Sequence, residues 1–199
     1  MTLLYTTILS LSLSFVAWMN LPQNYNEGLA AHQAGDYDTA LKEWRPLAEQ
    51  GNAITQYNLA LMYKNGEGIA EDNVEAAKWY QRAAEQGYAS AQNNLGNMYY
   101  NGEGVAEDFT QAVKWYRKAA EQGHTEAQSN LGLMYENGLG GLQDKVMAYM
   151  WFYVSGTAGL KPGADNRAAI EKRMTASQIA EAQKLARKCM KKNYKSCGR

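Results

Sequence analysis

The sequence predicts an all-α protein, an α/α superhelical solenoid of helix-turn-helix repeats. The first observation is a 36-residue period, which is marked by Trp79, Trp115 and Trp151. The second is the scarcity of strand-forming residues: six Val and five Ile stand beside many Ala, Leu, Met, Gln and Glu. Both observations favour helices, and the period indicates that the helices come in repeated pairs.

The composition is that of a globular chain, with 46% apolar and 20% charged residues among 199. Twenty basic and twenty acidic side chains cancel, which removes the simplest argument for a nucleic-acid partner. The cancellation hides an uneven distribution. Residues 1–160 hold nine basic and seventeen acidic side chains, a net charge of −8, and residues 161–199 hold eleven basic and three acidic, a net charge of +8.

An uncharged, mostly apolar stretch spans residues 3–19. As a helix it would be about 25 Å long, marginal for the ~30 Å hydrocarbon core of a bilayer. Residues 1–19 are therefore predicted to be a signal peptide with Ala17 as the cleavage position, although an uncleaved anchor and a core helix remain alternatives. On this prediction the mature chain has no membrane span and is exported.

Three units of equal length make up residues 53–88, 89–124 and 125–160, and the first two share twenty-two identical positions out of thirty-six. Residues 24–51 are interpreted as a shortened first repeat, whose loop at Gly35 is about four residues shorter and whose second helix contains Pro46. A single unit cannot bury its own apolar surface, so neighbouring units must stack.

Each unit is predicted to form two antiparallel helices. In the first, Leu95, Met98 and Tyr99 share one face, and Gly102 supplies the left-handed residue that ends the helix. Asp108 then caps the second helix, and a glutamine three residues later completes a capping box. The second helix carries one stripe of small and aromatic side chains: Ala112, Trp115, Tyr116, Ala119 and Ala120.

Residues 161–199 are predicted to form C-terminal capping helices and a basic tail. The segment Lys161-Pro162-Gly163 is interpreted as a turn, followed by a short helix over 167–174. Thr175 and Gln178 then form a capping box for a final helix with one apolar and one charged side.

The second unit, Gln-x-Asn-Leu-Gly-x-Met-Tyr-x-Asn-Gly-x-Gly-Val and then Ala-Val-Lys-Trp-Tyr-Arg-Lys-Ala-Ala-Glu-Gln-Gly within 92–123, resembles the Sel-one-like repeat (SLR) family. These proteins are relatives of the tetratricopeptide repeat, and the resemblance covers about 24–160. It implies a superhelix that acts as an adaptor or scaffold for protein complexes, often in the bacterial envelope. We therefore expect a monomeric, non-enzymatic protein that binds a peptide or helix in the periplasm or outside the cell.

In tetratricopeptide proteins, three positions around the small residue of the first helix face the concave groove. The small residues here are Gly28, Ala60, Gly96 and Gly132. The resemblance thus implies a partner-binding set: Tyr25, Leu29, His32, Tyr57, Leu61, Lys64, Asn93, Asn97, Tyr100, Ser129, Leu133 and Glu136. These side chains vary between units while the packing positions do not, which favours a contact surface, with plain solvent exposure as the alternative.

The sequence contains none of the H-E-x-x-H, S-x-x-K, G-x-S-x-G and G-x-x-x-x-G-K-[ST] motifs. His32 and His124 lack metal-ligand spacing, and His124 takes the place of Tyr88 in the preceding unit. The Gly-Glu-Gly loops carry an acidic residue that would repel phosphate. We therefore predict no catalytic residue, no metal and no cofactor. The alternative is a β-lactam-binding or hydrolysing enzyme, since the cysteine-rich branch of SLR proteins has been linked to that activity.

Cys189 and Cys197 lie among six basic residues of the tail. With a helix ending near Met190 and Asn193 turning the chain, the two thiols could meet, and similarity to the cysteine-rich branch also favours a disulfide. Free thiols and a metal site remain alternatives. The lysines could contact acidic lipid, contact the acidic body of a partner, or be solvated.

Overall fold

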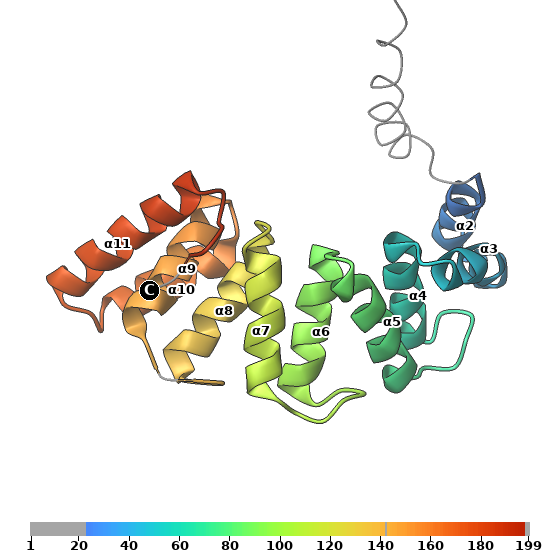
Figure 1. Cartoon of the computed structure of the whole chain (residues 1–199), viewed down its shortest axis with the longest axis horizontal. Coiled ribbons are helices and arrows are strands. Elements are labelled where there is room, and N and C mark those ends of the chain that lie inside the picture. The colour runs from blue at the N-terminus through green and yellow to red at the C-terminus, as the bar shows by residue number, and fades with distance from the viewer. Residues whose placement is uncertain (1–22, 142, 198–199) are drawn as a thin grey trace, which may run out of the picture.

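The computed structural model describes residues 23–141 and 143–197, all of whose regular elements are helices. The predicted all-α class is thereby confirmed, while the predicted signal peptide lies outside the described residues. The helices follow one another in a curved row in Figure 1: α2 (Gln23–Gln33), α3 (Tyr37–Glu49), α4 (Ala53–Asn65), α5 (Asn73–Glu85), α6 (Ala89–Asn101), α7 (Phe109–Ala120), α8 (Thr125–Asn137), α9 (Lys145–Thr157), α10 (Lys161–Glu171) and α11 (Ala176–Lys191).

Consecutive helices pair and then stack, as a solenoid requires. The pairs α4–α5, α6–α7 and α8–α9 pack internally, and α5–α6 and α7–α8 join one pair to the next. Inside each pair a small residue faces an aromatic ring. A methyl group added at Gly96 would lie 2.7 Å from the Tyr116 ring, and one at Gly132 would lie 2.6 Å from the Phe152 ring. This close approach sets the spacing between the two helices of a pair.

The helix ends are satisfied locally, which explains why they could be predicted. Asp72, Asp108 and Asp144 each accept hydrogen bonds from two backbone amides of the following helix. Gly66 and Gly102 end α4 and α6 in the left-handed conformation. Thr175 and Gln178 form the full capping box that was predicted for α11. The box predicted at Asp108 is only half formed: Asp108 accepts from the Gln111 amide, but within the described ranges the Gln111 side chain makes no return bond.

A buried ladder of glutamines links each unit to the one before it. Gln56, Gln92 and Gln128 donate to the carbonyl oxygens of Ala48, Ala84 and Ala120. The side-chain oxygens of Gln56 and Gln92 accept in turn from Gln86 and Gln122. Gln128 Oε1 is buried and has no partner in the described structure. Its missing donor is explained by the sequence, because the position equivalent to Gln86 and Gln122 is Ala158.

We expect Ala158→Gln to stabilise the protein by about 1 kcal/mol, because the new amide would donate to the unsatisfied Gln128 Oε1. Urea denaturation followed by circular dichroism measures the change. Ala158→Ser, whose side chain is too short to reach across, is the matched control and should leave the free energy of unfolding within about 0.5 kcal/mol. An equal gain in both variants would contradict the hydrogen-bond explanation.

The C-terminal region differs from the prediction at its start. Lys161-Pro162-Gly163 is not a turn but the first turn of α10, which ends at Glu171 and not at Met174. Proline suits this position because the first helical residues have no intrahelical partner for their N–H groups. Gly163 allows α10 to sit against α9, since a methyl group there would lie 2.2 Å from Ser155 Oγ.

The tail is folded back by a disulfide between Cys189 and Cys197, and both residues are buried. Asn193 and Tyr194 adopt positive φ angles of 49° and 65°, which reverse the chain direction after α11. The Tyr194 ring then lies beside Gly123, at the junction of α7 and α8. The cross-link thus holds the tail against the last repeats. In the described ranges, no helix combines the length and the apolar character that crossing a membrane requires.

Candidate interaction groove

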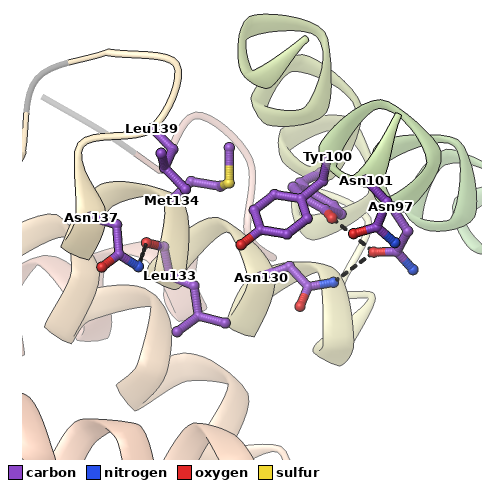
Figure 2. A pocket seen from close by; sticks show the side chains of 9 residues that line it. Asn97, Tyr100, Asn101, Asn130, Leu133, Met134, Asn137 and Leu139 are labelled. Carbon is purple, nitrogen blue, oxygen red and sulfur yellow. Dashed lines mark hydrogen bonds between the residues drawn. The ribbon is translucent and has the colours of Figure 1, made fainter. Parts of the chain in front are cut away.

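Two hollows open between the first helices of neighbouring pairs. We call them the α2–α4 hollow and the α6–α8 hollow. The first is lined by Tyr25, Leu29, His32, Trp44, Asn58, Leu61, Asn65 and Glu67. The second, shown in Figure 2, is lined by Asn97, Tyr100, Asn101, Tyr116, Asn130, Leu133, Met134, Asn137 and Leu139.

The structure brings seven of the twelve predicted groove residues to these hollows. The α2–α4 hollow contains Tyr25, Leu29, His32 and Leu61. The α6–α8 hollow contains Asn97, Tyr100 and Leu133. Tyr57 instead packs against Tyr80 and Tyr88, with ring centroids 5.7 and 5.1 Å apart.

The remaining four predicted residues are committed to contacts within the protein or are buried. Lys64 forms an ion pair with Glu103 of the next unit. Glu136 forms one with Arg173 of the C-terminal region. Asn93 and Ser129 are each only 4% exposed. A partner could not reach either of them without displacing neighbouring side chains, so both are outside the accessible surface.

Sequence reasoning missed the amide side chains that surround the α6–α8 hollow. Asn130 belongs to the recurrent Gln-x-Asn-Leu pattern, and Asn101 and Asn137 belong to the recurrent Asn-Gly pattern. These asparagines recur in every 36-residue unit, so variation between units does not single them out as contact residues. Because they recur on the groove side of each first helix, the sequence could have predicted that the repeated residues also supply polar groups to the groove.

Hydrogen bonds organise the amides at the wall of the α6–α8 hollow. Tyr116 donates its hydroxyl to Asn97 Oδ1 over 2.7 Å. Asn130 Nδ2 donates to Asn97 Oδ1 and to Asn93 Oδ1 over 3.3 and 3.1 Å. Burial raises the pKa of Tyr116, so its hydroxyl stays protonated as a donor. These bonds use Asn97 Oδ1 and Asn130 Nδ2.

A second feature, which we call the inter-repeat clasp, joins the glycine-rich loop of one unit to the first helix of the preceding unit. Glu67 accepts from Asn65 Nδ2 over 3.1 Å and from His32 Nε2 over 2.9 Å. Glu103 accepts from Asn101 Nδ2 over 2.9 Å and from Lys64 Nζ over 3.2 Å. Each carboxylate therefore bridges its own helix end and a basic side chain one unit earlier.

The clasp changes at the third junction. Leu139 occupies the position of Glu67 and Glu103, and Tyr100 occupies the position of their basic partners, His32 and Lys64. Asn137 has no carboxylate to contact there, and its Nδ2 donates to Leu133 O over 3.0 Å. At the end of the solenoid an ion pair returns, between Glu136 and Arg173. The α6–α8 junction is thus the one place in this series where the clasp is uncharged.

The histidines take structural positions. His124 precedes α8, and its Nδ1 accepts from the backbone amide of Ala127 over 3.3 Å. Burial lowers the pKa of His124, which favours the neutral ring that this hydrogen bond needs. His32 lines the α2–α4 hollow within its clasp. Among the residues that the structure describes, no three His, Cys, Asp or Glu side chains gather where they could hold a metal ion.

Solved structures of other proteins are similar to this chain. A Sel1 repeat protein from Oxalobacter formigenes is 28% identical, with a TM-score of 0.64 over 81% of this chain and 74% of that one. A protective antigen of uropathogenic Escherichia coli strains, which displays an SLR fold, is 36% identical, with a TM-score of 0.52 over 80% of this chain and 42% of the antigen. Helicobacter pylori cysteine rich protein B shares the fold at 18% identity, with a TM-score of 0.52 over 65% of this chain and 93% of that protein.

A stretch of 53 residues is also 40% identical to an exopolysaccharide production negative regulator of Rhizobium meliloti. This stretch covers 27% of this chain and 20% of the regulator. The chain therefore spans only a fifth of the regulator's length, and it spans less than half of the antigen's length. The family profile of the Sel1 repeat matches residues 53–88, 89–124 and 125–160. Because these three repeats make up more than half of the chain and are continuous with the stacked helix pairs described above, the protein belongs to the Sel1 repeat family.

Proposed function

We propose that this protein is a non-enzymatic interaction module that binds an extended peptide or a helix of a partner protein along its concave face. Proteins built from Sel1 repeats generally act as scaffolds for protein interactions. The observation that carries the proposal here is the exposure of Tyr100 (41%) and Leu133 (37%) in one hollow. Large hydrophobic side chains left exposed together at a concave site are typical of interaction surfaces.

The chemistry of the face favours a polypeptide over a nucleic acid. Asn97 and Asn130 offer a donor and an acceptor that suit a peptide backbone. Binding to a phosphate backbone depends on cations, whereas Lys64 is already paired with Glu103. The β-lactam-directed alternative gains no support from the α6–α8 hollow, whose lining consists of amides, phenols, aliphatic groups and a thioether, none of them basic at neutral pH.

Site-specific photo-crosslinking in the native cell tests the proposed face. We expect a photoreactive phenylalanine at position 133 to capture a discrete partner, and Asn97→Ala/Tyr100→Ala to abolish that capture. The same reagent at Val74, which is 51% exposed on α5, is the matched control and should capture no such partner. Equal products from positions 133 and 74, or capture unchanged in the double variant, would reject the assigned face.

We also propose that the protein is exported to an oxidising compartment, the periplasm or the cell exterior. The disulfide between Cys189 and Cys197 supports this, since such bonds persist mainly outside the reducing cytosol. Cell fractionation with thiol trapping is the test: export predicts an extracytoplasmic chain with no trappable thiol. A chain recovered from the cytosol with two free thiols would contradict it.

A further inference from the structure

Resting on the proposed function, we infer that the α6–α8 hollow is a receptor for a single aliphatic or aromatic side chain of an extended partner peptide. The concave face would then select its partner at one junction, while the other junctions contribute only the shape of the groove. The inference follows from the replacement of a charged clasp by apolar side chains at this place and nowhere earlier in the series.

Equivalent junctions along the solenoid differ in the charge of the side chains that bridge them. In the α2–α4 hollow, His32 and Glu67 place an imidazole and a carboxylate in the wall. At the next junction Lys64 and Glu103 form the corresponding ion pair. At the α6–α8 junction the pair is Tyr100 and Leu139, both of which line the hollow. The charged bridge that joins neighbouring units elsewhere is therefore absent from this lining.

The α6–α8 hollow has the size and the lining for one uncharged side chain. None of the nine lining residues is charged, and the cavity is about 250 Å³. An apolar cavity of about 150 Å³ admits benzene, so this one has room for a phenyl or leucyl group but not for a cofactor of ordinary size. A charged side chain would lose its hydration here without gaining an opposite charge. The lining thus favours an aliphatic or aromatic occupant.

Figure 2 shows Tyr100 and Asn130 on one side of the hollow and Leu133, Met134 and Leu139 on the other. The Tyr100 ring is held by Phe109, with ring centroids 5.6 Å apart. A wall that is already ordered loses less entropy when it binds. Asn97 Nδ2 and Asn130 Oδ1 take no part in the bonds of this wall, so they can serve the backbone on either side of the inserted side chain, which favours an extended peptide.

The test restores the clasp. Tyr100→Lys/Leu139→Glu reproduces the residues of the Lys64–Glu103 junction within the same repeat frame, so the fold is expected to survive. A phage-displayed random heptapeptide library is selected on the full chain. We expect the selected peptides to share one aliphatic or aromatic residue, and to bind the double variant at least tenfold more weakly. A tenfold change in affinity corresponds to about 1.4 kcal/mol.

Leu133→Ser, at an exposed position whose replacement leaves the core intact, is the second variant and should weaken the same peptides. Val74→Ser is the matched control and should not. Peptides that require Asn97 but bind the double variant as tightly as the original chain would overturn this inference and leave the proposed function standing. Selected peptides that are uniformly charged would overturn it as well, as would self-association through this hollow in sedimentation. If the library gave no peptide whose binding depends on the concave face, both the inference and the proposed function would be overturned.

Discussion

Gly104→Ala is expected to destabilise the protein by about 2–5 kcal/mol. A methyl group at Gly104 would lie 2.0 Å from the carbonyl oxygen of Asn73, at the start of the second helix one unit earlier, so the loop would have to move away. Overpacking typically costs about 1–3 kcal/mol. Gly104 also has a φ of +68°, and a left-handed conformation costs alanine about 1–2 kcal/mol more. Urea denaturation followed by circular dichroism measures the sum.

Gly87→Ala separates the two contributions. Gly87 has a φ of +92°, but no atom lies within 4 Å of the position that its added methyl group would take. We therefore expect only the backbone strain, about 1–2 kcal/mol. If both variants lost the same free energy of unfolding, the loop would be able to move away from Asn73 at little cost. The contrast also bears on function, because Gly104 follows Glu103 and a displaced loop would break the clasp to Lys64.

Trp151→Ala is expected to cost about 3–5 kcal/mol, the usual range for removing a large buried aromatic side chain. Trp151 is completely buried in a core that includes Ala186, Cys189 and Cys197 of the C-terminal region. Its loss would leave a cavity between the last repeat and the helix that caps the solenoid. Thermal unfolding of the full chain, with the disulfide intact, gives the measurement.

Trp151→Phe is the matched control and should lower the stability by well under half as much as Trp151→Ala. The indole Nε1 is buried without a hydrogen-bond partner in the described structure, so phenylalanine removes a donor that gains nothing in the folded state. The aromatic volume is largely kept. Equal destabilisation by alanine and phenylalanine would contradict the role assigned here to the aromatic volume.

The features that sequence alone predicts correctly are those that depend on residues close together in the chain. Asp72 and Asp108 cap their helices through backbone amides two and three residues away. Gly102 ends α6 because its own φ must be positive. The pairing of small and aromatic positions follows from the period itself, since one unit cannot bury both faces.

The misses have a common cause in contacts between distant segments. Lys161-Pro162-Gly163 has the composition of a turn, yet packing of Gly163 against Ser155 of α9 makes it the start of a helix. Asn93 was predicted to face the groove from its register, but it is buried, and its oxygen accepts from Asn130 of the next unit. Register specifies a direction from the helix axis, whereas exposure also depends on how closely the next helix approaches.

By itself the sequence determined that this protein is a row of stacked helix pairs, and where each pair begins and ends, because a period and a helix cap are local properties of a chain. Only the tertiary structure decided which groove residues remain accessible and which junction lacks a charged clasp. Those properties arise between residues 35 to 39 positions apart, such as His32 with Glu67 and Lys64 with Glu103. Their distances depend on the packing of successive units against one another, which no single unit specifies.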